Sequence, residues 1–482
     1  MFSFKNISEY QDQLANGHIN CVDAVTYYLD NITLKKHLNA FVEVFKEEAL
    51  QKAALLDKNR SEGLPMRKLH GVVIAIKDVI CYKDHKVTAS SAILKDFTSL
   101  FTAPALQFLL DEEAIVIGNC NCDEFAMGST NENSVYGNVL NAFDETKVPG
   151  GSSGGSAVAV QAKMCMCSLG SDTGGSVRQP ADFCGVFGFK PGYGSISRYG
   201  LLAYASSFDQ IGIFGNTSSD VRLLFSIMNR LDPMDSTMLP LEPVDEIFSG
   251  EKLKLCFFPQ VMSHPSLDYE IENSLNALMI SLTKAGHTVS PVGFNLLDYV
   301  VPAYYVLTTA EASSNLSRYD GVRYGHRASG STEDLDTFYK QNRSEGFGME
   351  VKRRILLGTF VLSTGYYDAY YSKAQKIRRL LIDQVTAIFN DFDAIVMPTV
   401  TTTAMPFGTN EKDPIALYLA DIFTVFANLT GIPALSVPLF KHSNNMPFGV
   451  QLLTNKRNEL TLLNIADTLM KQFRPGRVSV DG

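Results

Sequence analysis

The sequence lacks the usual marks of a membrane, secreted or P-loop protein. It contains no run of about 18 apolar residues, so no transmembrane helix is expected. Its first six residues, Met-Phe-Ser-Phe-Lys-Asn, pass directly into polar sequence and do not resemble a secretory signal. No Gly-x-x-x-x-Gly-Lys-Ser/Thr motif is present, which argues against a P-loop.

Positive charge is also scarce. Lysine and arginine total 42 against 51 acidic residues, giving a net charge of −9. An acidic chain of this kind is not expected to grip a nucleic-acid backbone over a broad surface by itself. Any nucleic acid that takes part in its function would be held mainly by another protein.

The eight cysteines include two Cys-x-Cys pairs but no Cys-x-x-Cys motif. No histidine lies close in sequence to Cys120 and Cys122, so we expect no metal, with a site at these two thiols as the less favoured alternative. Reduced, mostly buried thiols are typical of the cytoplasm, where we place the protein.

No proline- and serine-rich linker or block of like charges divides the chain. With 482 residues, 45% of them apolar, it can bury a large core. We predict a single domain over residues 1–482, with a peripheral helical insertion at residues 250–345. The motifs that carry chemistry fall within residues 60–200, which form the predicted catalytic core.

Segments with helical spacing alternate with short apolar segments that are typical of strands. This alternation predicts an α/β fold with a mixed central sheet covered by helices on both faces. The predicted helices lie at residues 18–32, 46–59, 102–110, 156–163, 376–390 and 460–473, and the predicted strands at 72–76, 114–118, 164–169, 431–438 and 449–453. In the helix at 376–390, the predicted buried side consists of Ile377, Leu380, Leu381, Val385 and Ile388.

Two clusters of glycine and serine stand at residues 149–156 and 171–180. They read Pro-Gly-Gly-Ser-Ser-Gly-Gly-Ser and Ser-Asp-Thr-Gly-Gly-Ser-Val-Arg-Gln-Pro, and the predicted helix and strand at 156–169 join them. Glycines at this density allow backbone N–H groups to converge on a small anion or carbonyl, because no side chain holds it away.

Three simpler explanations of these clusters fit poorly. Gly150-x-Ser152-x-Gly154 matches the nucleophile elbow of α/β-hydrolases, but a polar, turn-like run precedes it where that motif needs a strand. Asp172-Thr173-Gly174 matches the aspartic-protease triplet, which must occur twice and here occurs once. A flexible linker would not contain an apolar helix and strand.

The whole stretch from residue 149 to Pro191 closely resembles the amidase signature family, as does Gly-Val-Val-Ile-Ala-Ile-Lys-Asp at residues 71–78. The resemblance implies the amidase signature fold and a catalytic triad of Lys77, Ser152 and Ser176, with a cis peptide bond before Ser152. Ser176 would be the nucleophile.

The residue types fit this chemistry. An ammonium cannot accept a proton, so Lys77 must be neutral, and the apolar residues 72–76 would lower its pKa by desolvation. Ser152 would then relay a proton from Ser176 to Lys77. The backbone N–H groups of Thr173, Gly174 and Gly175 are the expected oxyanion hole, and Asp172 is expected to orient this turn.

Residues 123–134 also resemble the family. The hydroxyls of Ser129 and Thr130 are candidates for lining the substrate pocket, and an equally good interpretation is that they cap a loop.

Residues 197–212, 311–321 and 350–371 resemble one branch of this family, the glutaminase components of tRNA-dependent amidotransferases. That resemblance implies that Arg354 holds the α-carboxylate of glutamine and that Asp421 holds its α-amino group. A guanidinium and a carboxylate suit an amino acid zwitterion. The alternative is that both are solvated surface charges.

The function implied by this branch is hydrolysis of glutamine to supply ammonia for converting Glu-tRNA(Gln) to Gln-tRNA(Gln), or Asp-tRNA(Asn) to Asn-tRNA(Asn). Partner B and C subunits would complete a heterotrimer. The B subunit would bind most of the tRNA, together with ATP and Mg²⁺, so no cofactor is expected in this chain. The alternatives are a stand-alone amidase for a small carboxamide and a non-catalytic scaffold, against which the intact triad argues.

A few positions depart from the common family pattern. Asp182 replaces a small apolar residue, Gly192 and Ser195 stand where threonine and arginine are common, and Asn119-Cys120 replaces Lys-Thr. None of them is one of the three predicted catalytic residues.

Overall fold

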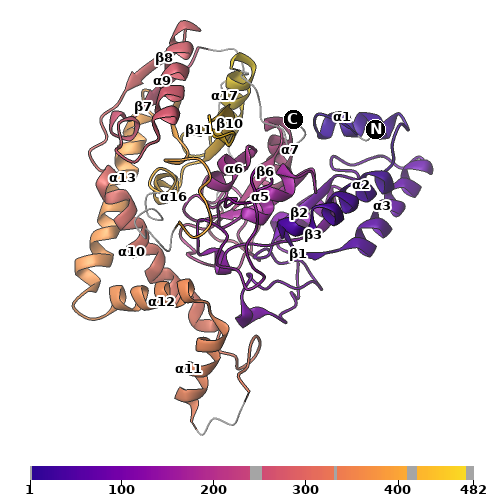
Figure 1. Cartoon of the computed structure of the whole chain (residues 1–482), viewed down its shortest axis with the longest axis horizontal. Coiled ribbons are helices and arrows are strands. Elements are labelled where there is room, and N and C mark those ends of the chain that lie inside the picture. Colours follow the sequence, from indigo (N-terminus) through magenta and orange to yellow (C-terminus); the bar gives the residue numbers. More distant parts are fainter. Residues whose placement is uncertain (1–2, 239–251, 330–333, 410–420, 474–482) are drawn as a thin grey trace.

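A mixed β-sheet runs through the centre of the molecule (Figure 1). The computed structural model describes residues 3–238, 252–329, 334–409 and 421–473, and within these ranges the sheet has eleven strands. Strands β3, β2 and β4 are parallel to one another, as are β9, β7 and β8, while the remaining neighbours pair antiparallel. In sheet order the strands are β1 (Phe41–Val44), β3 (Ile115–Cys120), β2 (Val73–Lys77), β4 (Cys167–Asp172), β6 (Gln210–Gly215), β5 (Phe187–Lys190), β10 (Ala434–Lys441), β11 (Pro447–Leu453), β9 (Ala394–Pro398), β7 (Lys254–Phe257) and β8 (Thr288–Pro291).

Helices cover both faces of this sheet, which confirms the predicted α/β fold (Figure 1). A π-helical turn at Tyr367–Ser372 lies between α12 and α13, two of the helices given below. The α-helices are α1 (Ile7–Ala15), α2 (Cys21–Leu34), α3 (Lys46–Ser61), α4 (Pro104–Asp111), α5 (Gly154–Gln161), α6 (Arg178–Cys184), α7 (Ser218–Met228), α8 (Pro259–Met262), α9 (Tyr269–Lys284), α10 (Leu297–Asn315), α11 (Leu335–Gly346), α12 (Met349–Leu362), α13 (Lys373–Ile388), α16 (Val425–Thr430) and α17 (Glu459–Gln472). Among the described residues, none of the helices is both long and apolar enough to cross a bilayer.

Strands β2, β3 and β4 are buried along their whole length. Continuous apolar runs such as Val-Ile-Ala-Ile in β2 are typical of parallel strands that are covered on both faces. Because β2 ends with Lys77, the same burial extends to a charged residue.

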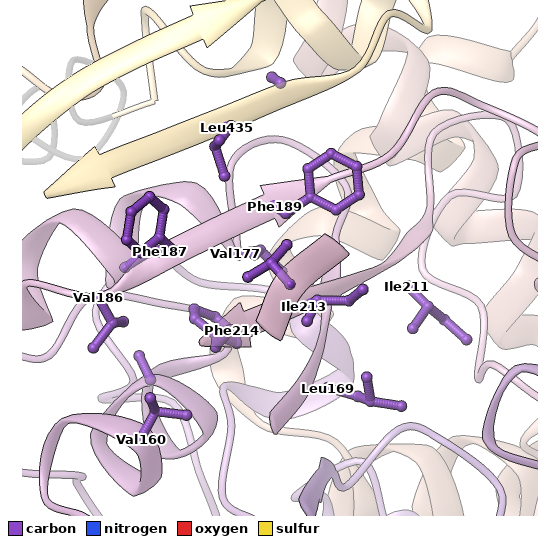
Figure 2. Packing of buried hydrophobic residues seen from close by; sticks show 14 of the residues in the cluster. Val160, Leu169, Val177, Val186, Phe187, Phe189, Ile211, Ile213, Phe214 and Leu435 are labelled. Atoms are coloured by element: carbon purple, nitrogen blue, oxygen red, sulfur yellow. The ribbon is translucent and has the colours of Figure 1, made fainter. Parts of the chain in front are cut away.

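Large apolar side chains fill the space around β5, β6 and the neighbouring helix α5 (Figure 2). Figure 2 shows Phe187 and Phe189 of β5 beside Ile213 of β6 and Leu435 of β10. This packing makes a rigid platform for the turns that leave β4 and enter β6.

The third predicted strand of the catalytic core begins later than the sequence pattern indicates. The pattern places it at residues 164–169, whereas β4 starts at Cys167 and runs to Asp172. Lys163 has a positive φ of 56° after the end of α5, so the chain turns there before it can extend. Helix α5 in turn begins at Gly154, inside the first glycine and serine cluster.

The buried side of α13 agrees with the prediction only in part. Leu381, Val385 and Ile388 are buried, but Leu380 is 51% exposed. The buried face begins one turn earlier, at Ala374, and follows positions 374, 381, 385 and 388, which leaves Leu380 outside it.

Residues 250–345 contain helices α8, α9 and α10, all but the last residue of α11, and strands β7 and β8. Strands β7 and β8 lie at one edge of the central sheet, and α11 lies far from the sheet (Figure 1). Residues 250–251 and 330–333 of this segment lie outside the described residues.

Helix α12 packs very closely on α10. A Cβ atom added at Gly358 would meet the carbonyl of Thr309, so only glycine allows this approach of the two helices. The contact fixes α12, which carries Arg354 on its buried face.

Candidate active site

Lys77 lies at the carboxyl end of β2, next to the parallel strand β4. Strand β4 ends at Asp172, where the second glycine and serine cluster begins. Because parallel neighbours end at the same edge of a sheet, the second cluster meets the lysine there. The first cluster reaches the same place through the hydrogen bond between Lys77 and Ser152. Its side chain is fully buried.

Three serine hydroxyls surround the Lys77 amine. Its Nζ donates to Oγ of Ser152 at 2.8 Å, of Ser153 at 2.9 Å and of Ser171 at 2.9 Å. An ammonium has three protons, so these hydroxyls account for all of its donors. Among the described residues no carboxylate forms an ion pair with this amine. Sequence reasoning identified Ser152 but not the roles of Ser153 and Ser171.

Burial lowers the pKa of Lys77 to about 8, although the nearby Cys122, Asp123 and Asp172 act to raise it. Desolvation disfavours the charged amine, as the apolar residues 72–76 led us to expect. A useful fraction of the amine is therefore neutral at mildly alkaline pH and able to accept a proton.

The loop before α5 is held on several sides. The Gly151–Ser152 peptide bond is cis, as the family resemblance implied. The Gly151 N–H donates to Oε1 of Gln179 at 3.1 Å, and the Ser152 carbonyl accepts from the N–H of Asp123 at 3.1 Å. A Cβ at Gly151 would strike the Asp123 carboxylate, so this loop approaches Asp123 as closely as backbone allows.

Ser176 lies beside this loop. The N–H of Ser153 donates to the Ser176 carbonyl at 3.2 Å, so the two clusters contact each other. Ser176 is 8% exposed, whereas Lys77 and Ser152 are 0% exposed. No hydrogen bond joins the hydroxyls of Ser152 and Ser176 in the described part of the chain. The amine is thus at the bottom of the site, and Ser176 is the serine nearest to solvent.

Asp172 is paired with Arg178. Arg178 donates from Nε at 3.1 Å and from Nη2 at 2.9 Å, and both side chains are fully buried. Burial alone would raise the pKa of Asp172, but the Arg178 guanidinium lowers it to about 2. A carboxylate this acidic is not a base, and its geometry fits the predicted orienting role.

One predicted oxyanion donor is already bonded. The Gly175 N–H donates to Oδ1 of Asp172 at 2.9 Å, so in this structure it is not free to bind an oxyanion. The other carboxylate oxygen of Asp172, Oδ2, accepts from the N–H of Val177 at 3.2 Å, so Asp172 holds this turn at two points. Thr173 and Gly174 remain as the candidate donors.

Asp421 and Ser129 lie together although 292 residues separate them. The Ser129 hydroxyl lies 3.1 and 2.9 Å from the two carboxylate oxygens of Asp421, and the Tyr305 hydroxyl donates to Oδ2 at 3.4 Å. Asp421 is 8% exposed, and burial raises its pKa to about 7. The alternative interpretation, a solvated surface charge, is therefore wrong for Asp421.

Arg354 is buried as well, at 5% exposure. It donates from Nη1 to the Tyr204 hydroxyl at 2.7 Å and from Nε to Glu350 at 2.9 Å. Burial acts to lower the pKa of Arg354, but Tyr204 and Glu350 hold it well above its usual range. Its guanidinium lies 5.7 Å from the centre of the Tyr305 ring, so Tyr305 contacts both Arg354 and Asp421.

Asp421 is connected through Thr424 to the turn from Asp172 to Ser176, which we call the nucleophile turn. The Thr424 N–H donates to the Asp421 carbonyl at 3.1 Å. The Thr424 hydroxyl donates to the Gly174 carbonyl at 2.6 Å. A Cβ at Gly174 would strike Tyr304, the neighbour of Tyr305 on α10. Asp421 and the tyrosines of α10 therefore adjoin the turn that carries Ser176. Tyr204, Glu350 and Tyr305 were missed because no local pattern distinguishes them from other helix or loop residues.

The described residues contain no group of three or more His, Cys, Asp or Glu side chains placed to hold a metal ion. Cys120 and Cys122 are buried thiols, and burial raises the pKa of Cys122 to about 12. Such thiols are poor metal ligands and poor nucleophiles.

Comparison with known proteins identifies the family of this chain. The model of the family described as Amidase matches residues 23–463. The chain belongs to the amidase family. A relative from Chlorobium chlorochromatii (strain CaD3), named as the A subunit of glutamyl-tRNA(Gln) amidotransferase, is 46% identical over 472 residues, covering 96% of this chain and 98% of the relative.

Two further members of the amidase family carry the same name. One, from Koribacter versatilis (strain Ellin345), is 46% identical over 437 residues, covering 89% of this chain and 90% of the relative. The other is a solved structure from Thermotoga maritima, with a TM-score of 0.77 and 36% identity, covering 96% of this chain and 95% of that one.

The positions that depart from the usual amidase pattern have partners of their own. The Gly192 N–H and the Ser195 hydroxyl both donate to Oε1 of Glu459, at 3.0 and 2.5 Å. Asp182 lies on α6 with Oδ1 3.4 Å from the Ser436 hydroxyl, and Asn119 donates to the Lys86 carbonyl at 2.7 Å. These bonds do not include the three predicted catalytic residues.

The amidase geometry predicts a pH dependence. Hydrolysis of a simple carboxamide should rise about tenfold from pH 6 to pH 7 and level off above about pH 9, because only neutral Lys77 accepts a proton and its pKa is about 8. A simple carboxamide is the right substrate because it has no amino group whose binding depends on Asp421. Initial rates across pH 5.5–10 measure this, and a rate that is flat or falls over that range would contradict it.

Proposed function

We propose that this chain is the glutaminase subunit of a tRNA-dependent amidotransferase. The observation that supports this best is that the chain holds a buried amine bonded to Ser152 and also a buried arginine and a buried carboxylate that share the neighbour Tyr305. The first arrangement suits amide hydrolysis, and the second suits a free amino acid as the substrate.

In the proposed reaction the Ser176 hydroxyl attacks the side-chain carboxamide carbon of glutamine. Its proton passes to Ser152, while the Ser152 proton passes to neutral Lys77. The N–H groups of Thr173 and Gly174 stabilise the oxyanion that forms. The proton returns by the same route to the departing nitrogen, ammonia leaves, and water then hydrolyses the acyl-enzyme to release glutamate.

Selection of glutamine depends on Arg354 and Asp421. Arg354 remains charged because Glu350 and Tyr204 are its neighbours, and it pairs with the α-carboxylate. Asp421 pairs with the α-ammonium group, whose positive charge lowers the pKa of that carboxyl below its value of about 7. Tyr305 contacts both groups, because its ring lies beside the Arg354 guanidinium and its hydroxyl donates to the Asp421 carboxylate.

The ammonia is proposed to serve a larger complex in the cytoplasm. The relatives are named as one lettered component of a glutamyl-tRNA(Gln) amidotransferase, which supports a complex of several subunits. In this proposal a partner B subunit binds tRNA, ATP and Mg²⁺, and a smaller C subunit completes the complex. The net charge of −9 agrees with tRNA being held mainly by a partner.

Arg354→Met should lower kcat/KM for glutamine by about 10–100-fold while leaving hydrolysis of propionamide within about twofold, because propionamide has no carboxylate to bind. Arg353→Met is the matched control, since that side chain is on the same helix and 68% exposed. Ammonia release measured for both amides is the readout, with Ser176→Ala as the background. Equal losses on the two amides would contradict the assignment of Arg354.

Copurification tests the proposed complex. Co-expressed with the B and C subunits of its own organism, the chain should elute as a heterotrimer that converts Glu-tRNA(Gln) with glutamine and ATP. The Ser176→Ala complex should still assemble and should still use ammonium chloride, but not glutamine, as the nitrogen source. A chain that elutes alone and hydrolyses propionamide as well as glutamine would instead be a stand-alone amidase.

A further inference from the structure

Asp209 is a buried carboxylate for which the proposed reaction has no use. It is 4% exposed and directly precedes β6. The antiparallel register of β4 and β6 pairs Asp172 with Gln210. One step further in this register, the residue after Asp172 lies opposite the residue before Gln210, which brings Thr173 beside Asp209. The sheet itself therefore aims this carboxylate at the nucleophile turn.

Asp209 accepts hydrogen bonds from two different segments. Its Oδ1 accepts from the Thr173 hydroxyl at 2.6 Å. Its Oδ2 accepts from the backbone N–H groups of Tyr204 and Ala205, at 2.9 and 3.0 Å. Burial raises the pKa of Asp209 to about 7, and the bonds from Thr173 and Ala205 act against that rise.

The first of these segments is the nucleophile turn, which we also call the oxyanion turn because it carries the candidate oxyanion donors. Thr173 begins the turn between β4 and Ser176, and its N–H is one of the two candidate oxyanion donors that remain. Because the Thr173 hydroxyl is held by Asp209, the peptide that carries the Thr173 N–H is less free to rotate. Donors contribute to catalysis only when they point at the position where the oxyanion forms.

The second segment holds the candidate glutamine-binding arginine. The Tyr204 hydroxyl accepts from Nη1 of Arg354 at 2.7 Å, and the guanidinium lies 5.4 Å from the centre of the same ring. Because the Tyr204 N–H is bonded to Asp209, the carboxylate sets where this phenol lies. One side chain thus connects the two halves of the site.

We propose that Asp209 is a positioning residue that fixes the oxyanion turn and the glutamine-binding arginine relative to each other. The arginine half of this proposal rests on the proposed glutaminase function, whereas the Thr173 half applies to any amide hydrolysed by Ser176.

Asp182 offers a matched control for a merely structural role. It is also buried, at 2% exposure, and burial raises its pKa to about 7 as well. Its hydroxyl partners are Thr399 and Ser436, and neither belongs to the oxyanion turn or to helix α12, which carries Arg354. If any buried carboxylate of this kind mattered only for folding, the two aspartates would respond alike to substitution.

The experiment compares Asp209→Asn, Thr173→Val and the double variant, each assayed with glutamine and with propionamide. Asp209→Asn should lower kcat about 10–100-fold on both amides and raise KM for glutamine alone. Thr173→Val should lower kcat similarly without changing KM for glutamine. The double variant should be no slower than Asp209→Asn, because both changes break the same contact. Thr173→Ser, which keeps the hydroxyl, should stay within about threefold of the unsubstituted chain.

Four results would overturn the proposal: unchanged kinetics in Asp209→Asn, losses that multiply in the double variant, an equal loss of kcat in Asp182→Asn, or full activity in Thr173→Val. The last decides the matter even if Asp209→Asn fails to fold. A chain that hydrolyses propionamide but not glutamine would refute the glutaminase function while leaving the Thr173 half of this test intact.

Discussion

Burial of the Lys77 amine is the constraint on which the rest of the site depends. An ammonium removed from water is unfavourable unless it is hydrogen-bonded, and a carboxylate partner would hold it in the charged form. The structure supplies three serine hydroxyls instead. Hydroxyls satisfy the ammonium and can also donate to the neutral amine, so both protonation states are accommodated.

The carboxylates near Lys77 are each satisfied by other donors. Asp172 pairs with Arg178, and Asp123 accepts from the backbone N–H groups of Asn131 and Asn133 at 2.9 and 3.0 Å. Asp78, the next residue along the chain, accepts from the N–H groups of Thr88 and Ser90 at 2.9 and 3.0 Å. Because these acids already have partners, Lys77 forms no ion pair within the described residues, which is what a base requires.

How far the sequence predicts this site depends on how local each feature is. The buried strand that carries Lys77 and the glycine and serine clusters with Ser152 and Ser176 are local patterns, and their geometry follows from adjacent strand ends. The bond between Asp172 and Gly175 depends on the shape of one tight turn, which residue types alone do not determine.

The candidate substrate-binding residues are less predictable because they come from distant segments. Ser129, Arg354 and Asp421 were identified only through resemblance, and their burial was not visible in the sequence. Tyr305 and Tyr204 join the site because α10 and the loop before β6 pack against α12 and the nucleophile turn. A tyrosine at helical spacing gives no sign of such a contact before the fold is known.

The most direct measurement is the ionisation of Lys77 itself. In a chain labelled with ¹⁵N-lysine, the Nζ resonance that disappears in Lys77→Met identifies this amine, and its shift with pH gives the pKa. We predict a pKa near 8. A pKa of about 10.4, as for a lysine in water, would leave the amine charged at working pH and would contradict its role as the base.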